Sequence, residues 1–195
     1  MSPEGARTRR TRSDSVRNRS EILDVAERHF ADRGVSASLE AVARDAGVGS
    51  ATLYRHFPTR DALLVELLDR RTAQVVSDIE RLEQMADSGE ALAGWMVALE
   101  EFFGVFDGLP GPLRDAFLEE HNPLASTCIG FIERTDHFLG AAQRDGKARA
   151  DVSGRDLFLA ALALSWARGS SLAGPDSPAR LRALLRDGFA GPDAG

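Results

Sequence analysis

The side chains that could carry chemistry gather in one short run, GVGSATLYRHFPTRDALL, at residues 47–64. At about 100° per residue in an α-helix, Leu53 and Phe57 share one face of this run, whereas Thr52 and Arg55 cluster on the opposite face. Such a helix packs on the protein through its apolar face and presents hydrogen-bonding groups outward. A helix of this kind can enter the major groove of DNA, where base edges carry a readable donor and acceptor pattern.

Each outward residue suits one part of a DNA duplex. Arg55 can span guanine O6 and N7, Thr52 can exchange hydrogen bonds with a base edge, and the Ala51 methyl group can meet a thymine methyl. Tyr54 and His56 lie on the two flanks and could reach phosphates on opposite groove walls. Further phosphate contacts are expected at neighbouring helix starts, from Ser38 and Arg60. The competing interpretation makes these surface residues of a helical hairpin without a ligand.

Three helices are expected to position this run. From Arg19, apolar residues recur at helical spacing until Gly34, which suits a helix C-terminus. Ser38 can cap a second short helix and Gly49 a third, with a glycine-containing turn between them. Helix, turn, helix is the arrangement of a helix-turn-helix. Pro58 disfavours the helical conformation at the preceding residue, so a new helix, long enough to join two modules, is expected after it.

The rest of the chain predicts only further helices, with no convincing strand or internal repeat. Five segments fit, at residues 90–106, 112–120, 124–143, 155–172 and 178–189. The fold class is therefore all-α. At 195 residues with 43% hydrophobic content, the chain can bury a sizeable core.

Charge is distributed unevenly along the chain. Residues 1–60 carry 11 Arg against 8 acidic residues, and the remainder carries 13 basic against 22 acidic residues. A basic front on an acidic body indicates that only the front meets a polyanion. Residues 1–18 are polar and Arg-rich and are expected to form a flexible basic arm, either a plain solvated tail or a DNA-contacting arm through Arg9, Arg10 and Arg12.

Several other classes of function find little support. No apolar run approaches the roughly 18 residues of a spanning helix, and no apolar signal region opens the chain, so a cytoplasmic protein without membrane contact is expected. Cys128 is the sole cysteine, and its spacing from His121 and His137 fits no compact metal-ligand motif. Glu100 and Glu101 are adjacent and point to different faces. We therefore expect no cofactor, no metal and no enzymatic activity.

Residues 19–64 strongly resemble the DNA-binding domain of the tetracycline-repressor (TetR) family of transcriptional regulators. The shared blocks are ILDVAERHFADRGV, SLEAVARDAGV and ATLYRHFPTRDALL, at the family's spacing. The resemblance assigns phosphate contacts to Ser38, Tyr54, His56 and Arg60, and base-facing positions to Ser50, Ala51, Thr52 and Arg55.

The chain departs from the family pattern at the start of the reading helix. Gly49 stands where the family usually has Ser, Ser50 where Lys is frequent, and Ala51 where Gly is frequent. The first change removes a hydroxyl group and weakens the cap by a few tenths of a kcal/mol. The second leaves less positive charge at the groove entrance, so the N-terminal Arg residues are expected to matter more.

The resemblance also implies that residues 65–195 form a helical ligand-binding and dimerisation domain. Most aromatic residues there are expected in the core, with a subset lining a mostly apolar pocket. The candidate ligand-binding residues are Trp95, Leu99, Phe102, Phe103, Phe106, Phe117, His121, Cys128 and Phe131. The candidate dimerisation residues on the last two helices are Leu157, Ala161, Leu162, Trp166, Leu181 and Leu185.

The apolar stripes of the last two helices fit two interpretations. They could build a four-helix interface around a two-fold axis, or simply an intrachain core. The helix-turn-helix favours the dimer, because paired reading helices about 34 Å apart suit half-sites one DNA turn apart.

Together these features predict a ligand-responsive, homodimeric repressor of a pseudopalindromic double-stranded DNA operator, released by a small apolar or amphipathic effector. A helical protein-interaction module and an all-helical enzyme remain the alternatives.

Overall fold

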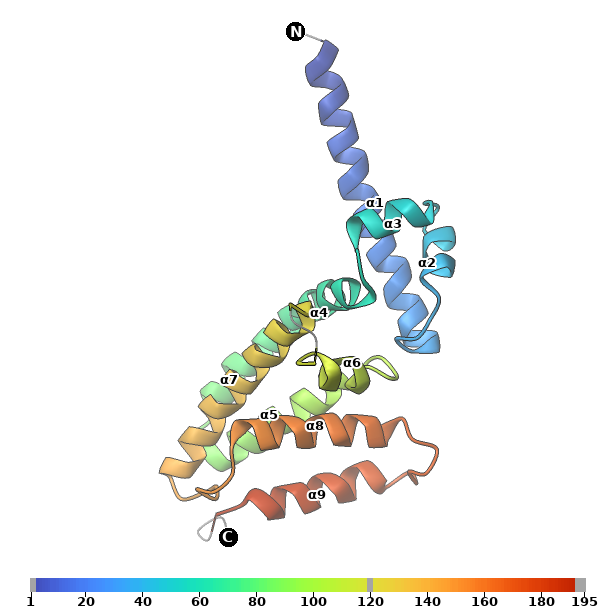
Figure 1. The fold of residues 1–195 in the computed structure, drawn as a ribbon. Helices are drawn as coiled ribbons and strands as arrows, with labels where there is room; N and C mark the ends of the chain where they lie inside the picture. Colours follow the sequence, from blue (N-terminus) through green and yellow to red (C-terminus); the bar gives the residue numbers. More distant parts are fainter. Residues whose placement is uncertain (1–2, 119–120, 192–195) are drawn as a thin grey trace.

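The computed structural model describes residues 3–118 and 121–191, and for residues 3–14, 73, 74 and 76–78 it describes the backbone alone. Over these residues the chain is helical, with a single isolated bridge between Ala148 and Ala190, which confirms the predicted all-α class (Figure 1). The helices are α1 (Pro3–Arg33), α2 (Leu39–Asp45), α3 (Ser50–His56), α4 (Arg60–Glu83), α5 (Ser88–Phe103), α6 (Pro110–Asp115), α7 (Pro123–Arg144), α8 (Gly154–Arg168) and α9 (Ser177–Phe189).

Local sequence signals set the boundaries of the N-terminal helices. The Ser38 hydroxyl accepts a hydrogen bond from the Ala41 amide at the start of α2, and the Thr59 hydroxyl accepts one from the Ala62 amide at the start of α4. Gly47, in the turn between α2 and α3, has a φ of 68°, a conformation that a side chain disfavours. These features confirm the predicted helix-turn-helix and its caps.

The first helix is longer than the sequence predicted. Residues 3–18 continue α1 as helix, where a flexible arm was expected, and in Figure 1 this part projects beyond the other helices. The sequence pattern gave no sign of this helix because the segment has no apolar stripe for another element to cover.

Three ion pairs fasten α1 to α4 at the junction between the two halves of the molecule. Arg19 pairs with Glu66 at 2.5 Å, and two further pairs continue along the same helices. These are Arg70 with Asp24 at 2.6 Å and Arg71 with Glu27 at 3.1 Å. A backbone contact adds to them, because the Val35 amide donates to the Asp107 carbonyl at 2.8 Å.

An aromatic core organises the C-terminal body, where α5, α7 and α8 pack together. Trp95 on α5 is fully buried and stacks on Phe138 of α7 with ring centroids 5.4 Å apart. Its indole nitrogen donates to the Thr135 hydroxyl at 2.9 Å, so the one polar atom of the ring is satisfied. Outside this core, α9 packs on α8 as the last layer (Figure 1).

Three of the predicted body helices end early, and the first of them, α5, ends at Phe103 where residue 106 was expected. The α6 helix ends at Asp115, where an end near residue 120 was expected, and α8 ends at Arg168 with Gly169 as its cap, four residues before the expected end. Among the described residues, no helix combines the length and hydrophobicity needed to cross a bilayer.

Candidate nucleic-acid interface and effector cavities

The short α3 helix has the two faces that the sequence predicted. Leu53 and the following Phe57 are almost completely buried against α1 and α2. The outward positions are exposed at Ser50, Ala51, Tyr54 and Arg55 and partly buried at Thr52 and His56. All six predicted α3 positions therefore lie on the part of the helix that is not buried, with Thr52 and His56 partly covered.

No steric constraint requires glycine at position 49. Its φ is −73°, which any residue adopts, and a Cβ atom added there would meet nothing within 4 Å. Gly49 caps α3 through its backbone alone, without a side-chain hydrogen bond. A serine would fit this space, so the missing hydroxyl is a chemical difference at the surface and has no packing consequence.

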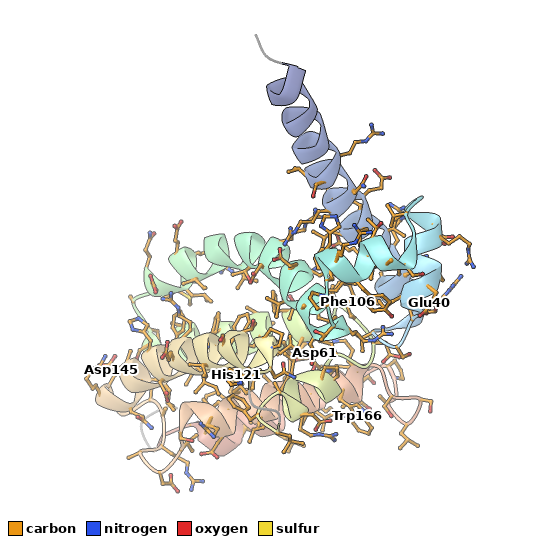
Figure 2. All side chains as sticks on the ribbon, turned by 45° about the horizontal axis from the view of Figure 1, so that its top comes forward. Glu40, Asp61, Phe106, His121, Asp145 and Trp166 are labelled. Atoms are coloured by element: carbon orange, nitrogen blue, oxygen red, sulfur yellow. The ribbon has the colours of Figure 1, made fainter. Side chains whose placement is uncertain are left out.

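An acidic residue that the sequence analysis did not single out lies among the candidate phosphate contacts. Glu40, labelled in Figure 2, accepts hydrogen bonds from the Ser38 hydroxyl at 2.8 Å and from the Tyr54 hydroxyl at 3.4 Å. Its own backbone amide and the Ser38 hydroxyl hold the pKa of Glu40 below its ordinary value. Glu40 therefore stays ionised and orients both hydroxyl groups, although its charge repels phosphate. Its place in the first turn of α2 was the signal available in the sequence.

Arg60 takes a different role from the expected one. Its guanidinium donates to the carbonyls of Val35 and Ala37 at 2.5 and 2.7 Å, and it lies over the Phe30 ring at 5.8 Å. In this structure Arg60 holds the loop between α1 and α2 and does not extend outward toward a phosphate. The Arg55 guanidinium, in contrast, donates to the Ala51 carbonyl at 3.2 Å, and the residue stays exposed.

The remaining DNA-binding candidates are Ser38 and three N-terminal arginines, and the structure describes the side chain of Ser38 only. Ser38 is exposed beside α3, as expected. The backbones of Arg9, Arg10 and Arg12 belong to α1, and their side chains lie outside the described part of the structure.

The candidate ligand-binding residues do not line a single cavity. Leu99, Phe103, Phe106 and Cys128 are at most 1% exposed and serve as core. Trp95 and Phe131 line a cavity of about 260 Å³ between α4, α5 and α7, whereas Phe102 and Phe117 line two other cavities. His121 is exposed in the turn before α7.

Half of the candidate dimerisation residues are already used inside the subunit. Leu157, Ala161 and Leu162 are at most 5% exposed and pack into the body, while Leu181 and Leu185 are half-buried. Trp166 is 62% exposed, as an interface residue requires. The exposed stripe of α8 runs instead through Leu159, Ala163 and Trp166, and on α9 Leu184 is the most exposed leucine.

The structure offers no ready metal site: within its described residues no group of three or more His, Cys, Asp and Glu side chains lies close enough to hold an ion. Cys128 is buried, and its thiol donates to the Leu113 carbonyl at 3.7 Å. Burial raises the pKa of Cys128 to about 11, which keeps the thiol neutral and unreactive.

Comparison with known proteins matches both halves of the chain. Residues 22–67 match the family of bacterial regulatory proteins described as the tetR family, and residues 87–191 match the C-terminal domain of SbtR-like transcriptional regulators. The transcriptional regulator EthR of Mycobacterium tuberculosis is 30% identical over 105 residues, 53% of this chain and 48% of EthR. The chain thus spans about half the length of this curated relative.

Two solved structures extend the similarity over nearly the whole chain. The TetR transcriptional regulator SCO0520 from Streptomyces coelicolor is 30% identical, with a TM-score of 0.57 over 89% of this chain and 99% of that chain. The regulator FadR from Bacillus subtilis, solved with stearoyl-CoA, is 20% identical, with a TM-score of 0.60 over 87% of this chain and 98% of that chain. At this identity the second likeness concerns the fold alone.

Proposed function

This chain belongs to the TetR family of bacterial DNA-binding transcriptional regulators, and we propose that it is a cytoplasmic, homodimeric repressor of a pseudopalindromic operator, released by a small effector. One observation carries the proposal. The α3 helix is seated by buried Leu53 and Phe57 and exposes Arg55 with partly exposed Thr52 on the opposite face. A rigidly held, polar, outward-facing helix is what major-groove readout requires.

Membership of a family of regulators confirms that the chain is not an enzyme. Family membership therefore argues against the alternative of an all-helical enzyme, and the exposed side of α3 fits a binding surface.

The α3 side chains would divide between reading bases and fixing register. Ser50, Ala51, Thr52 and Arg55 form the base-facing set. Phosphate contacts come from Ser38, Tyr54 and His56, with Arg9, Arg10 and Arg12 adding charge from the N-terminal part of α1. Arg60 serves as a positioning residue, since its donors are engaged by the carbonyls of the loop that precedes α2.

Dimerisation is proposed through α8 and α9, with a changed set of residues. Leu159, Ala163 and Trp166 recur at helical spacing on the exposed side of α8, and exposed Leu184 lies on α9. Contiguous exposed apolar stripes on a helix often mark protein interfaces. Trp166 lies at the edge of the body in Figure 2.

A transcription assay tests the repressor proposal. Single-round transcription is measured from a template whose promoter overlaps a site selected by the protein, with Arg55→Ala as the matched control. We expect wild type to reduce transcript yield in proportion to site occupancy and the variant to reduce it far less. Increased transcription at full occupancy would make the protein an activator, and binding of a protein partner without any DNA site would favour the interaction module.

A further inference from the structure

A further cavity, distinct from the three lined by candidate ligand-binding residues, lies between α5, α8 and α9. Its volume is about 300 Å³, and its apolar lining includes Met96, Leu164, Leu185 and Phe189. The charged lining groups are Glu100, Arg182 and Arg186. An apolar chamber with a few charged groups on one wall is the usual composition of a small-molecule site.

The charged wall is built around a buried carboxylate. Glu100 on α5 is only 1% exposed, and it accepts hydrogen bonds from two guanidinium groups. Arg168 of α8 donates to its Oε1 at 2.9 Å, and Arg182 of α9 donates to its Oε2 at 2.5 Å and to its Oε1 at 3.3 Å. One carboxylate therefore ties three helices together.

The residues that line this cavity include more positive than negative groups. Arg168 and Arg182 share Glu100, while Arg186, at the rim, pairs with exposed Glu90. Of the charged side chains that line the cavity, two are guanidinium groups, Arg182 and Arg186, and one is a carboxylate, Glu100. The charges around them balance, because Glu90 pairs with Arg186 and Glu101 acts on Arg182. Glu101, which also acts on Arg182, is exposed and lines the separate cavity between α4 and α5.

We propose that this cavity binds an amphipathic monocarboxylate, whose apolar part fills the chamber and whose carboxylate approaches Arg182 and Arg186. A ligand carboxylate would accept hydrogen bonds from the remaining N–H groups of these two lining guanidinium groups, whose forked geometry favours carboxylates. A ligand ammonium group would be repelled by the guanidinium groups, and the Glu100 oxygens already accept three hydrogen bonds.

The volume sets the size of the ligand. A water molecule occupies about 30 Å³, so a chamber of about 300 Å³ holds about ten non-hydrogen atoms. Octanoate has this number and serves as the probe. Octanol and octylammonium have the same chain with a neutral and a cationic head.

The proposed site adds a ligand class to the proposed function. Only the effect of the ligand on DNA affinity rests on that function, and ligand binding itself does not. A ligand held between α5 and α9 would fix the position of α9, which carries Leu184 of the proposed dimer interface. Ligand binding is measured without DNA, so its failure is distinct from a failure to bind an operator.

Calorimetric titration of the full chain with the three probes tests the site. We expect octanoate to bind at least tenfold more tightly than octanol, and octylammonium to bind most weakly. Arg182→Met leaves Arg168 paired with Glu100, so the fold keeps its buried charge compensated, and it should remove the preference for octanoate over octanol. Ala93→Phe places a ring in the chamber and should abolish binding of both.

The matched control is Gly130→Phe, which fills the cavity between α4, α5 and α7, where an added Cβ meets open space. It should leave octanoate affinity unchanged. Equal affinity for octanoate and octanol, or no octanoate binding by the wild type, would overturn the proposal. So would loss of binding in Gly130→Phe with retention in Ala93→Phe, because the ligand would then occupy the other cavity. Circular dichroism of each variant verifies that it is folded.

Discussion

Asn122 joins the C-terminal body to the first turn of α4. Its side-chain amide donates to the Asp61 carboxylate at 2.8 Å, and its side-chain oxygen accepts from the Leu124 amide at 2.9 Å to cap α7. The neighbouring Arg60 holds the loop that leads into α2. Figure 2 shows Asp61 at this junction between the helix-turn-helix and the body. Adjacent residues of α4 thus contact both halves, Asp61 at the start of α7 and Arg60 at the loop before α2.

Replacing Asn122 by Asp separates its two roles. The carboxylate still caps α7, but it cannot donate to Asp61 and repels it. We expect the free energy of unfolding to fall by about 2 kcal/mol, the scale of a hydrogen bond to a charged group, and the effect of an effector on operator affinity to shrink. Urea denaturation and DNA titrations with and without effector measure both quantities.

Asn122→Ala is the companion variant, because it removes the cap as well as the contact with Asp61. We expect Asn122→Ala to lower the free energy of unfolding by about 1 kcal/mol more than Asn122→Asp does. If both variants respond to effector like the wild type, the Asn122–Asp61 contact does not transmit the signal.

The dimer interface is tested by a charge at the exposed stripe of α8. Trp166→Glu places a carboxylate that an apolar interface would have to desolvate. Sedimentation velocity should show a shift to monomer, and affinity for a palindromic duplex should fall by at least tenfold, since the two half-sites are then bound independently. Leu118→Glu, at a residue 80% exposed outside α8 and α9, is the control and should stay dimeric. A dimeric Trp166→Glu protein would place the interface elsewhere.

Removing residues 1–14 tests the role of the N-terminal arginines. Each phosphate neutralised by Lys or Arg adds roughly 0.9 to the magnitude of the slope of log affinity against log salt. We therefore expect the truncated chain to bind more weakly at low salt and to show a slope reduced by about 2 or more. The measurement is fluorescence anisotropy over a salt series. An unchanged slope would make this part of α1 a bystander.

Cys128 should resist thiol reagents in the folded state. Its pKa is raised to about 11 by burial, so the reactive thiolate is scarce at every pH below that value. At pH 8 we expect labelling by a disulfide reagent to be more than about 100-fold slower in the native protein than in guanidinium chloride. Rapid labelling of the native protein would show that the α7 region opens readily.

The sequence predicted the helix-turn-helix well because its signals are local. Ser38, Gly49 and Thr59 cap helices that begin at the next residue, and their effect needs no distant partner. The position of Arg60 could not be predicted, because its acceptors at Val35 and Ala37 are set by the folded path of the preceding loop.

The C-terminal helices show a second reason why some site residues could not be predicted from the sequence. The α8 helix carries apolar residues on nearly every side. The spacing of these residues therefore could not show that Leu157 and Ala161 face the core while Leu159 and Trp166 face outward. The pairing of Glu100 with Arg182 joins residues 82 positions apart and had no local signal. A cluster of residues this far apart in the sequence becomes visible only in the folded structure.

Selection of the purified protein against a random duplex library at fixed, moderate salt, with Arg55→Ala selected in parallel, tests directly whether α3 reads DNA. We expect a two-fold-symmetric motif for the wild type, and for the variant the same motif with preference relaxed at one base pair per half-site, by about 1–3 kcal/mol. No enriched motif, or identical motifs from the two proteins, would contradict the proposed reading surface of α3.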